Sequence, residues 1–84
     1  MKTVMEISYV LIQCDLGYEA EIIKKLMEIP LVKEVRGTYG VFDIFVKIVS
    51  DSKEGTDDAV ISIRKISHIG GTNTLVAILS QGGK

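Results

Sequence analysis

The residues best suited to chemistry lie in one short segment, residues 36–44, where two glycines and an aspartate stand between two apolar runs. Gly37 and Gly40 permit positive φ angles or a close approach of the backbone to another group. Asp43 directly precedes residues 44–49, an apolar run rich in β-branched side chains that indicates a strand. A carboxylate at the mouth of a buried strand can hold a small cation such as an α-ammonium group. The other interpretation is a hairpin loop with a turn aspartate, which the local sequence favours because Asp and Gly dominate turns for conformational reasons.

The remaining candidates for catalysis or metal binding are few. Cys14 comes at the end of a predicted strand, where we expect a buried, inert thiol. We expect His68 at the C-terminal end of a helix, where its charged form would interact favourably with the helix dipole. One His and one Cys cannot form a zinc site within one chain, and Asp57 and Asp58 resemble a solvated helix face rather than an acid–base pair. We therefore expect no catalytic residue, no metal site and no cofactor.

Length and composition indicate a domain that cannot bury all its apolar residues alone. The chain has 84 residues, which corresponds to one domain spanning residues 1–84. A domain of this size buries only about 60–65% of its unfolded surface. Yet 46% of the residues are hydrophobic, and the mean hydropathy is +0.29. This is more apolar material than one small core can bury, so we expect a partner subunit.

Charge and hydropathy exclude two classes of partner. The net charge is −1, and Lys and Arg are scattered, whereas nucleic-acid binding needs a basic patch. The apolar runs are far shorter than the roughly 20 residues that span a bilayer. The first residues lack the apolar core and cleavage site of a signal peptide. We therefore expect a cytoplasmic protein that binds neither nucleic acid nor membrane directly.

Periodicity predicts the elements that must position the 36–44 segment. Apolar, β-branched runs predict strands over residues 6–14, 32–39, 43–49 and 72–79. An apolar stripe at helical spacing predicts a first helix from Gly17 to about Ile29, and Pro30 ends it. The second strand carries the most charge, so we place it at or near a sheet edge.

A second helix follows the third strand. Asp51 can cap its N-terminus, with Glu54 as the capping-box partner. Gly55 weakens the first turn by about 1 kcal/mol relative to alanine. We expect the helix to end near Ser67, with the two glycines at 70–71 separating it from the last strand.

The predicted order is β-α-β-β-α-β, the ferredoxin-like plan. Right-handed crossovers place both helices on one face of a four-stranded antiparallel sheet, which makes an α+β sandwich. Its core would span about residues 6–79, followed by a disordered tail at 80–84. Three strands are apolar on both faces, which indicates that both faces are buried. Because an exposed apolar patch of that size marks an interface, we hypothesise a homodimer that packs sheet against sheet.

Three segments in the right order carry a resemblance to a known family. Residues 39–44 are similar to its Gly-x-x-Asp-aliphatic signature, residues 72–74 to the opening of its last strand, and residues 29–34 to its helix-to-strand turn. Over residues 6–79 the chain thus resembles the effector-binding domain of the Lrp/AsnC regulators, also called the RAM domain. Family members usually carry an N-terminal helix-turn-helix domain. Because Met1 leads almost directly into the first strand, the chain resembles the stand-alone members without that DNA-binding domain.

The resemblance implies a homodimer that assembles into a ring of dimers and binds a small amino-acid effector in clefts between dimers. The residues it assigns to the ligand are Gly40, Val41, Phe42, Asp43, Thr72 and Thr74. Asp43 would receive the α-ammonium group, the loop backbone would hydrogen-bond the ligand, and the two threonines would offer hydroxyls and amides to its carboxylate. The loop and the start of the last strand can meet at one end of a four-stranded sheet. The chain would then be an amino-acid sensor that does not itself touch DNA.

Two other functions stay open. The chain could be a ligand-free assembly module that forms mixed oligomers with a DNA-binding Lrp/AsnC relative. It could also be a small ferredoxin-like dimeric enzyme. An enzyme of that kind would need a polar or aromatic cavity between helices and sheet, and the sequence shows no such polar cluster.

Overall fold

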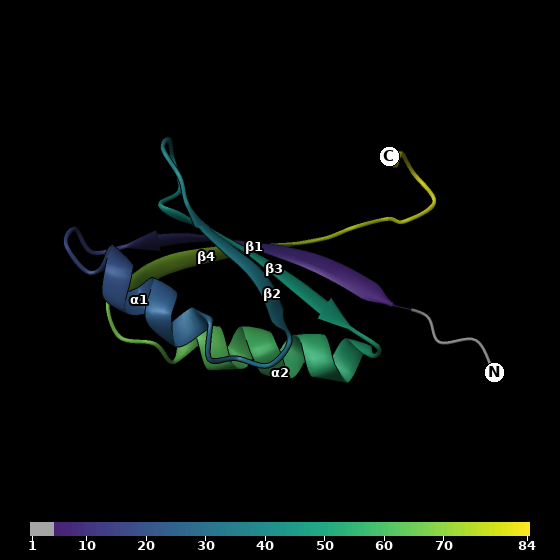
Figure 1. Ribbon diagram of the computed structural model, residues 1–84, viewed down its shortest axis with the longest axis horizontal. Helices are drawn as coiled ribbons and strands as arrows, with labels where there is room; N and C mark the ends of the chain where they lie inside the picture. Colours follow the sequence, from purple (N-terminus) through teal and green to yellow (C-terminus); the bar gives the residue numbers. More distant parts are fainter. Residues whose placement is uncertain (1–4) are drawn as a thin grey trace.

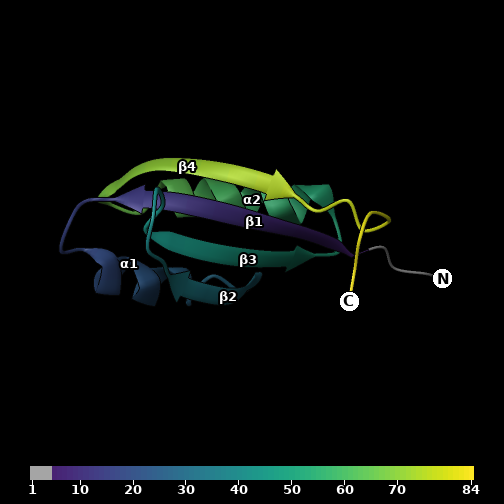
Figure 2. The same cartoon turned by 90° about the horizontal axis from the view of Figure 1, so that it is seen from above.

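The structure, a computed structural model, describes residues 5–84. Its elements are β1 (Glu6–Cys14), α1 (Glu19–Leu26), β2 (Val32–Gly37), β3 (Ile44–Ser50), α2 (Lys53–Arg64) and β4 (Ile69–Val76). The strands form one four-stranded antiparallel sheet in the order β2-β3-β1-β4. Both helices lie on the same face of this sheet (Figure 1), and the view from above shows the strand order (Figure 2). The predicted α+β, ferredoxin-like sandwich is confirmed, whereas the expectation about Met1 falls on residues 1–4, outside the described residues.

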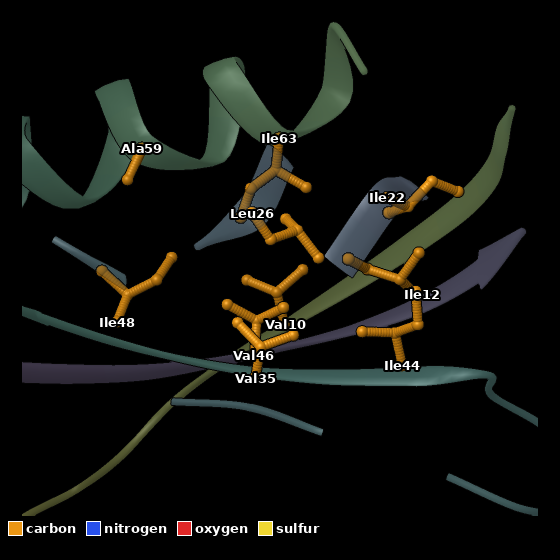
Figure 3. Close-up of a cluster of buried hydrophobic side chains, with 10 residues drawn as sticks. All are labelled: Val10, Ile12, Ile22, Leu26, Val35, Ile44, Val46, Ile48, Ala59 and Ile63. Atoms are coloured by element: carbon orange, nitrogen blue, oxygen red, sulfur yellow. The ribbon is translucent and has the colours of Figure 1, made fainter. Parts of the chain in front are cut away.

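The core lies between the sheet and the two helices (Figure 3). It consists of aliphatic side chains that are at most 9% exposed: Val10, Ile12, Ile22, Leu26, Val35, Ile44, Val46, Ile48, Ala59 and Ile63. Side chains alternate along a strand, so every second residue of β1 and β3 reaches this layer. Burying one large aliphatic side chain contributes about 1.5–3 kcal/mol. This layer therefore fixes the helices on the sheet and holds the strand ends from which the 36–44 segment extends.

Helix α1 is shorter than predicted at both ends. Gly17 has a φ of +92°, which is not helical, and the helix begins at Glu19. The predicted end at Ile29 is also wrong, because the last turn tightens after Leu26. There the N–H of Glu28 donates to the Lys25 carbonyl and that of Ile29 to the Leu26 carbonyl, at 3.2 and 3.1 Å. Such i to i−3 bonds are common where a helix closes.

Helix α2 begins with a different cap from the one predicted. Ser52, not Asp51, is the N-cap, and its Oγ accepts a hydrogen bond from the Gly55 N–H at 3.0 Å. Gly55 also has a packing role, because a Cβ there would overlap Ser50 Oγ and lie 3.3 Å from Leu31 Cδ1. The glycine that weakens the helix locally therefore lets its first turn approach β3. The helix ends at Arg64, before the predicted Ser67.

Strand β4 starts and ends earlier than predicted. It includes the two glycines expected to precede it, because β1 pairs with this segment from Cys14 opposite Ile69 to Ser8 opposite Val76. Pairing with β1 therefore overrides the local tendency of glycine to break a strand. Beyond β4 the Ala77 N–H still donates to the Ile7 carbonyl at 2.9 Å. The strand itself ends at Val76, so the predicted end at Leu79 is wrong.

Strand β2 is an edge strand, as predicted from its charges. Its Arg36 Nε lies 3.7 Å from Glu34 Oε2 in an exposed ion pair. The strand ends at Gly37 rather than Tyr39, because the chain then turns into the loop before β3.

The sheet face opposite the helices is also largely apolar along β1 and β3, as predicted for these two strands, with Lys47 opposite Tyr9 as a charged exception. On β4 this face carries Asn73 and Leu75, so the prediction of a second apolar face does not hold for that strand. The half-buried side chains of this face alternate with those of the core: Ile7, Tyr9, Leu11, Phe45 and Val49. The rings of Tyr9 and Phe45 stack here with centroids 5.6 Å apart. No helix among residues 5–84 lies on this side of the sheet (Figure 1). We call this face the open face. None of the helices in residues 5–84 has the length and apolar character needed to cross a membrane.

Candidate functional site

The loop between β2 and β3 is a closed, protruding structure. The Thr38 N–H donates to the Asp43 carbonyl at 2.9 Å, and Thr38 Oγ1 donates to the Phe42 carbonyl at 2.8 Å. Gly40 has a φ of +125°, which other residues rarely adopt. The loop rises on the side of the sheet away from the helices (Figure 1), and Tyr39 and Val41 at its tip are exposed. The loop thus exposes its apolar tip to solvent.

Asp43 anchors this loop to the end of β1. Its N–H donates to the Ile12 carbonyl at 2.8 Å, and its Oδ2 accepts the Cys14 N–H at 2.9 Å. The Gln13 side chain adds a bond from Nε2 to the Val41 carbonyl at 2.9 Å. An ionised carboxylate has two oxygens and several acceptor positions, so one backbone bond leaves capacity for an ammonium group. The turn role and the ligand role considered for Asp43 are therefore compatible.

Cys14 lies next to this carboxylate and is half-buried. Burial raises the pKa of the Cys14 thiol, and the neighbouring carboxylates of Asp43, Glu19 and Asp15 raise it further. The thiolate is the reactive form of cysteine, so a raised pKa makes the side chain a poor nucleophile at neutral pH. This supports the expected inert thiol.

Thr72 and Thr74 lie on the helix side of β4. Thr72 pairs with Ile12 and Thr74 with Val10, and residues paired across an antiparallel ladder share a face. Thr72 Oγ1 accepts a bond from Arg64 Nε at 3.3 Å. Thr74 Oγ1 is buried and has no hydrogen-bond partner among the described residues.

Asp43 and Thr72 lie at the same end of the sheet, because Thr72 pairs with Ile12 and Ile12 pairs with Ile44, the residue after Asp43. Strand β1 lies between β3 and β4, and the loop before β3 rises on the side away from the helices (Figure 1). The predicted residues Gly40, Val41, Phe42 and Asp43 form one group, and Thr72 and Thr74 form another. The two groups are thus on different strands, with β1 between them.

Thr74 borders a groove that the sequence did not reveal. The groove has a volume of about 550 Å³ and runs between α2 and β4. From α2 it is lined by Lys53, Thr56, Asp57, Val60, Ile61 and Arg64, from β4 by Thr74 and Val76, and from β1 by Glu6. The α2 residues recur at i+3 and i+4 spacing, which places them on one helix face. That spacing was readable in the sequence, but only the strand order shows that this face meets β4.

His68 is not the helix C-terminal residue we expected. It lies in the loop after α2, with a φ of +73°. Its ring stacks on Tyr18 with centroids 3.5 Å apart. Its Nδ1 lies 3.2 Å from Asp15 Oδ2, and its carbonyl accepts the Asp15 N–H at 2.9 Å. These contacts tie the loop before α1 to the loop before β4, which is a structural role.

No group of three or more His, Cys, Asp and Glu side chains in residues 5–84 is placed to hold a metal ion.

Comparison with known proteins identifies the family. The profile of the Lrp/AsnC ligand binding domain matches residues 7–80. No curated protein sequence matches the chain. The crystal structure of FFRP-DM1 is 34% identical, with a TM-score of 0.82 over 87% of this chain and 99% of that one. The hypothetical protein PHS023 from Pyrococcus horikoshii is 33% identical, with a TM-score of 0.82 over 93% of this chain and 94% of that one.

A full-length regulator shares the fold. Escherichia coli AsnC is 22% identical and has a TM-score of 0.84 over 94% of this chain. The match covers 54% of AsnC, so the chain corresponds to about half of that protein. The profile match and the two structures above 30% identity show that this chain belongs to the Lrp/AsnC family as a ligand-binding regulatory domain.

Proposed function

We propose that this chain is a cytoplasmic amino-acid sensor that works as a homodimer assembled into a ring of dimers. The proposal rests first on the family, which the match over residues 7–80 shows. It rests also on the apolar open face, because an uncovered patch of this kind favours association with another copy. The observation that carries the sensing role is the Asp43 carboxylate, held at the base of a protruding glycine loop by the Cys14 N–H.

The ligand in this proposal is a zwitterion. Asp43 receives its α-ammonium group, and the backbone of the loop at Gly40, Val41 and Phe42 approaches it closely. Thr72 and Thr74 serve its carboxylate. Because β1 separates the two groups within one chain, the loop of one copy and β4 of another complete the site together.

The test is a thermal-shift screen against the twenty amino acids, with Asp43→Asn as the informative variant. Asparagine keeps an oxygen that can accept the Cys14 N–H but lacks the charge that binds ammonium. A ligand at about 100 times its Kd stabilises the folded state by about 2.7 kcal/mol. We expect at least one amino acid to stabilise the wild type, and Asp43→Asn to lose that response with its oligomer and its ligand-free Tm retained.

Two results would count against the sensor. A wild type that responds to no amino acid at millimolar concentration would contradict it. An Asp43→Asn variant that loses its oligomer would make Asp43 a structural residue. The silent result would favour the second candidate, a ligand-free module that joins a DNA-binding Lrp/AsnC relative. One observation favours that candidate, namely that Asp43 already has a backbone partner in Cys14.

A further inference from the structure

The outer edge of β4 lacks the features that normally keep an edge strand from pairing. β4 lies at one edge of the sheet and β2 at the other (Figure 2). Edge strands usually carry charged residues or proline, because their free N–H and C=O groups can otherwise pair with another chain. β2 follows this rule with Lys33, Glu34 and Arg36. Residues 69–79, which include all of β4, contain neither a charged residue nor proline, so this edge is open to an added strand.

The groove between α2 and β4 lies beside this edge and has opposite charges toward its two ends. Arg64 marks one end, where its Nε donates to Thr72 Oγ1 at 3.3 Å. Toward the other end lie two carboxylates, Glu6 and Asp57, and one ammonium group, Lys53. Two negative charges and one positive charge leave a net charge of −1 there, against +1 at Arg64. The rest of the lining is uncharged: Thr56, Val60, Ile61, Thr74 and Val76.

The charges of Asp57 and Arg64 are not matched by an ion pair within residues 5–84. Both side chains are exposed. They are seven residues apart, which places them on one face of α2 and separates them by about 10.5 Å along the helix axis. A guanidinium group has five N–H donors, so the bond to Thr72 leaves most of the Arg64 donors available. Each charge can therefore pair with a group from outside the chain.

A second copy supplies the matching charges if two β4 strands pair antiparallel. The two-fold axis of such a pair reverses the direction of the groove in the partner, and every contact occurs twice. A strand rises about 3.4 Å per residue, so the separation of Asp57 and Arg64 along α2 corresponds to about three residues of β4, from Thr72 to Leu75. A pair centred between Asn73 and Thr74 would bring Arg64 toward Asp57 of the partner subunit.

We propose that the outer edge of β4 binds β4 of a second copy, so that two four-stranded sheets become one sheet of eight strands. Backbone hydrogen bonds and exposed apolar side chains such as Val76, which is 57% exposed, provide the attraction. Exposed ion pairs are individually weak, so the paired charges of Arg64 and Asp57 of the partner subunit select the antiparallel register.

This contact is separate from the open face. Two different two-fold contacts on one chain connect more than two copies, so the edge of β4 joins one dimer to the next. The inference rests on the proposed ring of dimers and names the surface through which the dimers meet. It does not use Asp43, so it can be tested apart from amino-acid sensing.

The experiment is sedimentation velocity of the full chain at micromolar concentration, with charge reversals at the two ends of the groove. The variants are Arg64→Glu, Asp57→Arg and the double variant that carries both. Arg36→Glu is the matched control, because it reverses an exposed arginine on the opposite edge strand. Hydrogen–deuterium exchange over residues 69–79 is measured on the same samples to report on strand pairing.

We expect the wild type to sediment as a species larger than two copies of the 9.2 kDa chain. Each single reversal places like charges opposite one another twice in every contact, which opposes association, so both variants should shift to the dimer. The double variant restores opposite charges and should recover the large species, and Arg36→Glu should not differ from the wild type. Exchange over residues 69–79 should be slower in the large species than in the dimers, because the outer N–H groups of β4 become hydrogen-bonded.

The outcomes separate this inference from the sensor function. A wild type no larger than a dimer, single variants that keep the wild-type size, or a double variant that fails to recover it would overturn the β4 contact. Equal exchange over residues 69–79 in the large species and the dimers would overturn it too. If Asp43→Asn still lost the response to an amino acid in those cases, sensing would stand. If the double variant recovered assembly but no amino acid stabilised the wild type, the β4 contact would stand and sensing would fall.

Discussion

In the proposed sensor, Asp43 would serve folding and recognition together. Its Oδ2 holds the Cys14 N–H at 2.9 Å and fixes the loop at the end of β1. A carboxylate that is already positioned loses little side-chain freedom when a ligand arrives, which favours binding. This explains why Asp43→Asn is more informative than Asp43→Ala, which would remove the charge and the backbone contact at once.

Gly55 provides a prediction at the scale of one residue. Helix propensity predicts that Gly55→Ala would gain up to about 1 kcal/mol. The structure predicts the opposite sign, because the new Cβ would overlap Ser50 Oγ and crowd Ser52 Oγ at 3.2 Å. We expect Gly55→Ala to lower the free energy of unfolding by about 1–3 kcal/mol, the usual cost of overpacking. Urea unfolding at one fixed protein concentration measures it.

Gly37→Ala is the control for this experiment. A Cβ at Gly37 meets no atom within 4 Å, and its φ is not in the left-handed region. We expect a change within about 0.5 kcal/mol. Equal effects of the two substitutions, or a stabilised Gly55→Ala, would show that the first turn of α2 does not pack closely on β3.

At the scale of the elements, the sequence predicted the order and type of every element but, apart from β1, not both of its ends. Strand β1 was predicted at the observed residues, because its apolar run stops at the Asp15-Leu16-Gly17 break. The start of β4 was wrong because the pair Gly70-Gly71 resembles a break locally, and only pairing with β1 makes it a strand. Where local sequence was ambiguous, contacts between distant segments set where the element starts.

Substitutions at the N-terminus of α2 can test whether Ser52, rather than the predicted Asp51, is the N-cap. Ser52 Oγ accepts the Gly55 N–H at 3.0 Å, whereas Asp51 precedes the cap. Loss of an N-cap typically costs about 1 kcal/mol. We therefore expect Ser52→Ala to lower the free energy of unfolding by about that amount and Asp51→Ala to change it much less, as measured by urea unfolding. The reverse order of the two effects would restore Asp51 as the cap.

The candidate site could be predicted only in part, because local sequence does not show how the strands pair. The glycine loop and Asp43 were identifiable because their roles are local. The face of β4 that carries Thr72 and Thr74 was not, because Leu75 and Val76 make both faces of that strand apolar. Register with Val10 and Ile12 sets the face, and register is a property of the folded sheet. The groove lined by Arg64 was missed because nothing local to α2 indicates that its end meets β4.

At the scale of the whole molecule, the sheet has apolar side chains on both faces, but the helices cover only one of them. The helices cover one face, while Tyr9, Leu11, Phe45 and Val49 occupy the open face. Large apolar patches on soluble proteins mark interfaces, and a second copy offers the same apolar surface for a two-fold contact. Covering the open face would also bring loops from different copies near one another. In the proposed sensor the oligomer and the effector site are linked, because β1 separates Asp43 from Thr74 within one chain.

The most direct test of this account is the mass of the protein in solution. Sedimentation velocity at micromolar concentration should show a species of at least two copies of the 9.2 kDa chain, with larger assemblies if dimers form a ring. A single species near 9.2 kDa across the concentration range would leave the open face in water. That result would contradict both the shared site and the oligomeric sensor.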